Sequence, residues 1–428
     1  MFNLLSMTFT KTSFSPWLWA LALVFLITAC ISQPISYQRY DLTTLNETVE
    51  AAPATYSSSA NYDNDAYLPD TLHPEYTPRR GVMINIHIMN TQDTFYKIYE
   101  GEAGTQYMKN LVATANQALQ TNKKSTLMPT GMDVPVYPFN FKIYLAKKPG
   151  TNEAAIYRHY DDELYPFIFR GPKRNLGDRK VLNKYGVNLD TELNIFVMPP
   201  HVDSLDSKTF RPNEGTGVFL GKGIKLSGLY PEKFAPWRHQ GNLLHEIGHA
   251  LGLNHAWRND GCDDTREHSN NCWSKDQSAR CDTMTSNNLM DYSAKQHVLT
   301  PCQIGRIHAR FGNLKSRSRD WLRRDWCKPA RDEKEITIAA NISWAGARDL
   351  NTHIRIKTGG RLYIDNRLHL ARGRKITVEP GGILELGPKA WLHNDCEENW
   401  AGIDTGNNGR EYGEVIIDPL ARVENTEL

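Results

Sequence analysis

Three histidines and a glutamate stand close together between residues 245 and 255, in the order His-Glu-x-x-His-x-x-Gly-x-x-His. On an α-helix, His245 and His249 project from one face about one turn apart, so both imidazoles could bind one metal ion. A glycine at 252 in the left-handed conformation would end that helix and bring His255 in as a third ligand. Three neutral imidazoles and one open position for water are typical of a catalytic zinc site, with Glu246 placed as general base.

Strands and helices that could position this motif alternate through the first part of the chain. The predicted strands lie at 82–88, 139–145 and 193–198, and the predicted helices at 105–119 and 237–251. A glycine-interrupted stretch, 216–226, is interpreted as an edge strand that could pair with an extended substrate. Thr300 and Gln303 predict the capped start of a further helix. The pattern indicates an α/β (α+β) domain with a mixed, twisted sheet and an active-site helix.

Residues 245–255 resemble the zinc-binding segment of the metzincin peptidases. The segment Asn287-Asn288-Leu289-Met290-Asp291-Tyr292 is similar to the tight turn that holds a methionine beneath the metal in that group. The cysteine-containing stretch 261–282, followed by Thr300-Pro301-Cys302-Gln303, resembles the pappalysin (cytophagalysin) family within it. The resemblance covers about residues 80–325 and is strongest from 241 to 311.

This resemblance implies a zinc endopeptidase domain over 80–328. The implied roles are zinc ligands for His245, His249 and His255, general base for Glu246, a structural floor for Met290, and hydrogen bonding to the tetrahedral intermediate for Tyr292. Some family members bind calcium near the cleft. Asp263, Asp264 and Asp282 are the candidate ligands for such an ion here, although acids in a polar loop are more often simply solvated.

The N-terminal residues 1–29 predict export. The uncharged apolar stretch 17–29 is too short to span a bilayer and is typical of a signal-peptide core. It ends in Ile27-Thr28-Ala29-Cys30, which resembles a bacterial lipobox, so we expect Cys30 to carry a lipid that holds the protein to a bacterial membrane, at the outer membrane or cell surface. An ordinary cleaved signal is the alternative. The polar residues 30–79 lack apolar periodicity and are predicted to form a disordered tether.

Six of the seven cysteines remain once Cys30 is set aside, and in an exported protein an even number favours disulfides. Four of them lie close together, and we expect two disulfides among them with the pairing left open. These four are Cys262, Cys272, Cys281 and Cys302. The other two are Cys327 and Cys396.

The last part of the chain, 334–428, is predicted to be a β-rich repeat domain. Residues 354–364 align with 376–386 at a period of 22, with Gly-Gly pairs matched, and 415–423 is a weaker third copy. The repeat favours a short parallel β-solenoid, with a small antiparallel sandwich as the alternative. No histidines here have metal-ligand spacing, so we expect this domain to be dispensable for cleaving short peptides.

Composition limits the classes of partner. The 428 residues carry 50 Lys and Arg against 48 Asp and Glu, a net charge of +2, so nucleic acid is not an expected partner. A mean hydropathy of −0.53 excludes a protein with many membrane spans. The expected partners are a protein or peptide substrate and, through the lipid, a membrane. An adhesion lipoprotein with a relic peptidase domain is the alternative function, and the retention of Glu246 and the three histidines argues against it.

Overall fold

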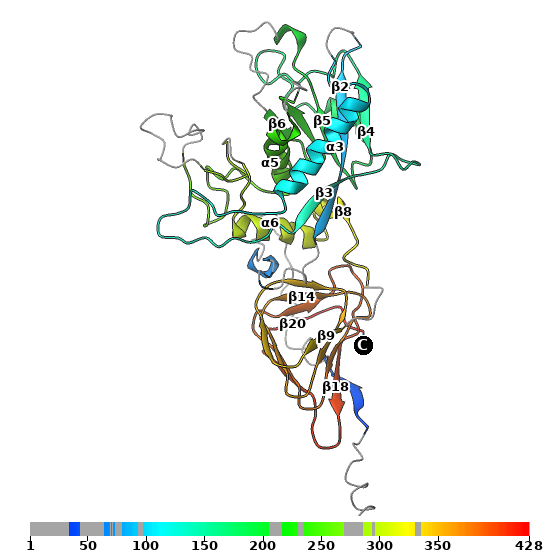
Figure 1. Ribbon diagram of the computed structural model, residues 1–428, viewed down its shortest axis with the longest axis vertical. Helices are drawn as coiled ribbons and strands as arrows, with labels where there is room; N and C mark the ends of the chain where they lie inside the picture. The colour runs from blue at the N-terminus through cyan, green and yellow to red at the C-terminus, as the bar shows by residue number, and fades with distance from the viewer. Residues whose placement is uncertain are drawn as a thin grey trace, which may run out of the picture.

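The computed structural model describes residues 34–42, 64–68, 70, 72, 79–92, 97–204, 216–229, 235–268, 286–292, 296–329 and 335–427. The chain forms a mixed α/β domain and an all-β C-terminal region that pack end to end (Figure 1). The expected signal peptide and Cys30 lie outside the described residues. Among the helices that the structure describes, none has the length and apolar character needed to cross a membrane.

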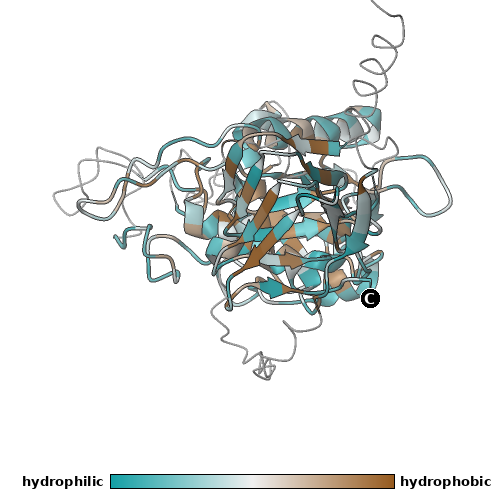
Figure 2. Cartoon of the chain, turned by 90° about the horizontal axis from the view of Figure 1, so that it is seen from below, coloured by the Kyte–Doolittle hydropathy of each residue, from teal (hydrophilic) through white to brown (hydrophobic). Residues whose placement is uncertain are grey.

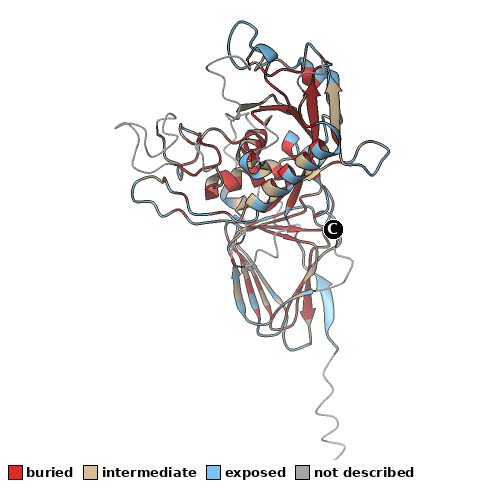
Figure 3. Cartoon of the chain, turned by 45° about the horizontal axis from the view of Figure 1, so that its top comes forward, coloured by how far each residue is buried: buried red, intermediate tan, exposed pale blue. Residues whose placement is uncertain are grey.

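A seven-stranded mixed sheet forms the centre of the α/β domain, with strand order β3-β2-β5-β7-β6 and with β4 and β8 also paired to β2. The strands are β2 (Arg80–Asn90), β3 (Phe141–Leu145), β4 (Ile156–Tyr160), β5 (Leu193–Val197), β6 (Thr216–Phe219), β7 (Gly223–Ser227) and β8 (Leu322–Arg323). Strands β6 and β8 are antiparallel to their neighbours and the other pairs are parallel. Strand β2 is the longest and is buried over nearly its whole length (Figure 3).

Helices α3 (Gly101–Ala118) and α5 (Gln240–Ala250) pack on one face of this sheet, with Leu111 and Leu244 in the same apolar core as Ile86 of β2. The structure also describes the helices α4 (Lys180–Tyr185), α6 (Pro301–Gly312) and α7 (Arg317–Asp320), and the short 3-10 helices η1 (Asn64–Tyr67), η3 (Val202–Ser204) and η4 (Pro236–Arg238). Helix α6 begins at the predicted capping box, in which the Thr300 hydroxyl accepts from the Gln303 N–H and the Gln303 side chain accepts from the Thr300 N–H.

The predicted single strand over 216–226 is instead a hairpin. Strand β6 turns at Gly221, whose φ of +87° suits glycine, and returns as β7, paired antiparallel. Of these two strands, β6 lies at an edge of the sheet, whereas β7 pairs on its other side with β5. The alternation across 216–226 did not reveal this turn because apolar residues occupy both strands.

The C-terminal region consists of three stacked sets of short parallel strands. Its strands are β9 (Glu335–Ile338), β10 (Asn341–Trp344), β11 (Arg348–Leu350), β12 (His353–Ile356), β13 (Arg361–Ile364), β14 (Arg367–Leu370), β15 (Ile376–Val378), β16 (Ile383–Leu386), β17 (Trp391–His393), β18 (Ile403–Asn407), β19 (Glu414–Ile417) and β20 (Arg422–Val423). Each strand from β12 onward pairs in parallel with the strand three places earlier. Parallel pairing rules out the antiparallel sandwich.

The structure refines the repeat in two respects. Each turn of the chain has three strands rather than two, and Ile336, Ile354 and Ile376 lie in register on successive turns. The first turn, β9 to β11, was missed because its spacing to the next turn is 18 rather than 22 residues at Ile336. Apolar side chains fill the interior of the stack, so brown and teal residues alternate along its strands (Figure 2).

The described parts of 30–79 do not form a free tether. Strand β1 (Ser36–Arg39) pairs antiparallel with β18, and Leu42 packs into the apolar interior of the C-terminal region. Helix η1 lies against α6, and the Asp70 carboxylate forms an ion pair with Arg348. The prediction of a disordered tether over 30–79 is therefore corrected for these residues, because the last turn of the stack offers β1 an unpaired strand edge.

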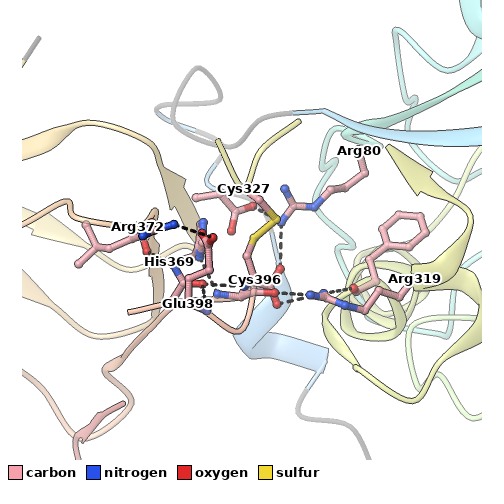
Figure 4. The surroundings of a disulfide bond; sticks show 12 residues. Arg80, Arg319, Cys327, His369, Arg372, Cys396 and Glu398 are labelled. Atoms are coloured by element: carbon pink, nitrogen blue, oxygen red, sulfur yellow. Dashed lines mark hydrogen bonds and ion pairs between the residues drawn. A yellow bond between two sulfur atoms is a disulfide. The ribbon is translucent and has the colours of Figure 1, made fainter. Parts of the chain in front are cut away.

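The α/β domain packs against the sheet formed by β11, β14, β17 and β20 (Figure 1). Arg80, at the start of β2, donates to Asp349 of β11 at 2.8 Å, and Arg319 of α7 lies 3.4 Å from the Asp395 carboxylate. The disulfide between Cys327 and Cys396 joins the two halves covalently (Figure 4). Both arginines are almost fully buried and point toward the loop that carries Cys396 (Figure 4).

Candidate active site

Helix α5 and the turn after it bring three imidazoles together. His245 and His249 lie one turn apart on α5, and the Nε2 atoms of His249 and His255 are 3.1 Å apart. One ligand nitrogen from each of the three lies within 4.8 Å of the others. The three imidazoles therefore lie close enough together to bind one metal ion, as their spacing in the sequence predicts.

The turn that places His255 is a Schellman motif. The Leu253 N–H donates to the Gly248 carbonyl at 2.9 Å and the Gly252 N–H to the His249 carbonyl at 3.0 Å. Gly252 has a φ of +93°, the left-handed conformation that the sequence predicted at this position. The turn directs the chain that follows α5 back toward His245 and His249, so that His255 lies beside them.

Backbone carbonyls fix the orientation of the two helical imidazoles. The Nδ1 atom of His245 contacts the Leu289 carbonyl at 2.8 Å, and Nδ1 of His249 contacts the Leu253 carbonyl at 2.9 Å. Because a carbonyl can only accept, each Nδ1 carries the proton and each Nε2 presents a lone pair. Burial lowers the pKa of His245 to about 3 and that of His255 to about 4, so these imidazoles are neutral at pH 7.

This donor set fits zinc. Two nitrogens bound to one tetrahedral zinc at about 2.0–2.1 Å would lie about 3.3 Å apart, close to the separation of the His249 and His255 Nε2 atoms. The Nε2 atom of His249 lies next to Nε2 of His255, the arrangement expected when two imidazoles bind the same cation. Three neutral imidazoles are ligands typical of a catalytic zinc ion.

Glu246 lies beside these histidines in an apolar, enclosed position. Its side chain is buried, and its Oε2 atom is without a hydrogen-bond partner among the described residues. Burial raises the pKa of Glu246 to about 8, in the absence of the positive charge that a bound metal would place beside it. A Cβ atom on Gly217 of β6 would lie only 2.4–2.6 Å from the Glu246 side chain. The edge strand therefore packs directly over the carboxylate.

The segment predicted as the methionine turn lies beneath the helix. Met290 is fully buried, and a Cβ atom on Gly248 would come within 2.3 Å of its sulfur. The Met290 carbonyl accepts from the Ala256 N–H at 3.0 Å, which ties the turn to the residue after His255. The Tyr292 ring centroid lies 4.8 Å from that of His255 and 5.8 Å from that of His245, and its side chain is 40% exposed.

The structure describes two of the three loop acids, Asp263 and Asp264. The Asp264 carboxylate accepts from the Cys302 N–H at 2.9 Å and so caps α6, whereas Asp263 is exposed. Cys262 and Cys302 form a disulfide, which confirms that pair among the four predicted and removes their sulfurs as metal ligands. Asp282, Cys272 and Cys281 lie outside the described residues.

Sequence reasoning missed several residues that support the site. Gly217 is one, and its only signal was a glycine inside an apolar stretch. Asp291 is another, because its buried carboxylate contacts His268 at 2.5 Å and accepts from the Tyr292 N–H at 2.7 Å. Burial would raise the pKa of Asp291, but these hydrogen bonds hold it below its usual value. Gln296 lies against His245 and donates to the Asp291 carbonyl.

No protein-family model and no curated protein matches the chain. Among solved structures, the chain is similar to mirolysin in complex with compound 9, with a TM-score of 0.38 and 18% identity over 57% of this chain and 96% of that chain. It is also similar to mature mirolysin of Tannerella forsythia in complex with a cleaved peptide, with a TM-score of 0.36, 18% identity and the same coverage. At these values the likeness is distant.

Proposed function

We propose that the protein is a zinc-dependent endopeptidase of the pappalysin type. The observation that carries the proposal is the convergence of His245, His249 and His255 beside the enclosed carboxylate of Glu246. A zinc ion held by these imidazoles would supply a Lewis acid that polarises the scissile carbonyl and lowers the pKa of water. The alternative of an adhesion protein with a relic peptidase domain gains no support, because the three histidines and Glu246 lie in an arrangement suited to zinc binding and hydrolysis.

The residues of the chain would then divide the work as follows. The free Oε2 atom of Glu246 can accept the proton of the attacking water and pass it to the leaving amine, as a general base and then a general acid. The Tyr292 hydroxyl, on a half-exposed ring beside His255, can donate to the oxyanion. The edge strand β6 can hold an extended peptide by main-chain hydrogen bonds, which favours cleavage within a chain.

We also propose the location and the form of the rest of the molecule. Export and a lipid on Cys30 would hold the enzyme at the outer membrane or cell surface, as the lipobox-like segment indicates. The pairing of each C-terminal strand with the strand three places earlier supports a short parallel β-solenoid over 335–427.

The exchange Glu246→Gln tests the proposed chemistry. It removes the base and leaves all three ligands, so we expect one zinc per chain and a fall in peptide hydrolysis of about 10²-fold or more. Metal analysis and cleavage of a peptide library, with and without chelator, measure the two effects. The exposed Glu153→Gln is the matched control and should keep full activity. Full activity in Glu246→Gln would refute the mechanism.

A further inference from the structure

The N-terminal segment leaves the molecule at the end farthest from the candidate active site. Strand β1 pairs with β18 so that Ser36 is opposite Asn407, at the tip of the C-terminal region. Figures 1 and 3 both place β1 and this end of β18 away from α5. We call this corner, made by residues 35–37 and 406–412, the apex. Three residues separate Cys30 from the first described residue, Pro34, so the two Cα atoms are at most about 14 Å apart.

The apex carries large apolar side chains in the open. Ile35 is 45% exposed, Tyr37 46% and Tyr412 63%. Ile35 and Tyr37 converge over Gly406, where a Cβ atom would meet both at 3.2–3.3 Å, and Tyr412 follows across the Asn407 bridge. Next to Tyr412 lie Arg410 and Glu411, both exposed, so this corner combines apolar and aromatic side chains with charges that cancel.

We propose that the apex rests on the lipid bilayer that holds the protein, with Ile35, Tyr37 and Tyr412 in the headgroup region. The inference rests on the proposed lipid anchor at Cys30, because that anchor and a link of three residues would hold the apex at the membrane surface. Tyrosine suits this depth, since its ring is apolar and its hydroxyl is polar. Because the adjacent charges cancel, the contact is apolar rather than electrostatic. The candidate active site then lies in the half of the molecule remote from the membrane (Figure 1).

Hydroxyl-radical footprinting of the full lipidated chain tests this orientation. The protein is compared on neutral phosphatidylcholine vesicles and as the soluble Cys30→Ser variant, and oxidation of each tyrosine is measured by mass spectrometry. We expect Tyr37 and Tyr412 to react at least about fivefold more slowly on vesicles, since side chains at the interface are buried among headgroups. Tyr160 of β4 is the matched control within the same molecule, because it is 40% exposed in the α/β domain, and its oxidation should not change.

Each other outcome is distinct. Wild-type protein that does not sediment with vesicles would overturn both the lipid anchor and the docking of the apex. Protein that sediments while Tyr37 and Tyr412 react as fast as in Cys30→Ser would overturn the docking alone. Protection that requires anionic lipid would refute the apolar contact. Protection without vesicles that rises with protein concentration would assign the apex to a second copy of the chain instead. None of these outcomes depends on peptidase activity, so the proposed catalysis is tested separately.

Discussion

Glu246 is positioned by a residue that lies 29 places before it in the chain. Strand β6 packs against α5, and the absence of a side chain at Gly217 leaves room for the Glu246 carboxylate. The neighbouring His245, a proposed zinc ligand, is fixed separately, through its hydrogen bond to the Leu289 carbonyl. The proposed metal binding and the placement of the Glu246 carboxylate can therefore be disturbed independently.

The exchange Gly217→Ala should separate the placement of the Glu246 carboxylate from zinc binding. A methyl group 2.4 Å from Glu246 Cγ forces the carboxylate or β6 to move, so we expect turnover to fall about 10-fold or more while zinc content stays near one per chain. Gly177→Ala, where a Cβ atom would meet nothing within 4 Å, is the control. Equal losses of zinc and turnover would show instead that Gly217 supports the whole site.

The sequence was sufficient for the residues of the site whose relation is local. The positions of His245, Glu246 and His249 follow from helical spacing, and the Gly252 turn then determines where His255 lies. Met290 and Tyr292 needed a family resemblance, since no rule of spacing links them to a helix about 40 residues earlier. Gly217 could not be predicted, because its contact with Glu246 depends on how a hairpin folds over the helix.

At the scale of elements, the C-terminal turn of α5 decides whether the third imidazole reaches the other two. At position 252 the backbone has a φ of +93°, which other residues adopt only with strain. A Cβ atom there would also lie 2.4 Å from the Arg310 side chain. The Schellman hydrogen bonds then direct Leu253 and His255.

The exchange Gly252→Ala should therefore weaken zinc binding. We expect an increase of at least about 10-fold in the zinc dissociation constant, since strain of about 1–2 kcal/mol adds to the clash with Arg310. Competition with a fluorescent chelator measures it. Gly150→Ala controls for backbone strain alone, because Gly150 has a φ of +73° and nothing within 4 Å. Unchanged zinc affinity would mean that the turn tolerates a side chain.

The elements themselves were predicted unevenly. Long periodic segments such as β2 and α3 were found because apolar residues recur along one face over many residues. The turn at Gly221 and the strands β9 to β11 were missed, since two-sided burial hides a hairpin and an irregular spacing hides a repeat. Strand β1 was missed because its polar side chains are exposed and its order comes from backbone pairing with β18.

At the scale of the whole molecule, the two halves share one buried cluster of charges. Asp349 of the C-terminal region pairs with Arg80 at 2.8 Å and with Arg367 at 2.6 Å, and all three side chains are at most 4% exposed. Burial would raise the pKa of Asp349, but the two arginines hold it well below its usual range. A chain ending near Lys328 would leave Arg80 without these carboxylates and Cys327 without Cys396. We therefore expect the α/β domain to need the C-terminal region for stability, which differs from the sequence-based prediction that this region is dispensable for cleaving short peptides.

The exchange Asp349→Asn should destabilise the protein by about 3–5 kcal/mol, because it leaves buried arginine charge uncompensated. The loss is measured from urea unfolding. Glu335→Gln, which removes a partly exposed pair with Arg355, should cost less than about 1 kcal/mol and is the matched control. Similar losses in both variants would contradict the importance of burial at the junction.

Acid should also loosen the junction. Burial lowers the pKa of His308 to about 4 and that of His369 to about 3, and His369 Nδ1 accepts from the Asp395 N–H at 2.7 Å. Unfolded histidine titrates near 6.5, so the unfolded chain binds more protons below that pH and stability falls as the pH decreases. Each histidine should remove about 2 kcal/mol between pH 7 and pH 5.

Unfolding at both pH values, with chelator present throughout so that zinc release does not contribute, measures this fall. The variant His369→Gln should show a shallower fall. If its stability decreased with pH as steeply as that of the wild type, the buried neutral histidine would not be responsible.

The pairing of β1 with β18 has a consequence for how the chain acquires its structure. Ser36 and Asn407 are 371 residues apart, so a strand near the start of the chain must wait for one of the last to be synthesised. Contacts of such high contact order form slowly, because a long loop has to close before they contribute. Any chain whose synthesis stops before residue 403 would lack β18 and leave β1 unpaired, so this strand pair can form only once the polypeptide is nearly complete.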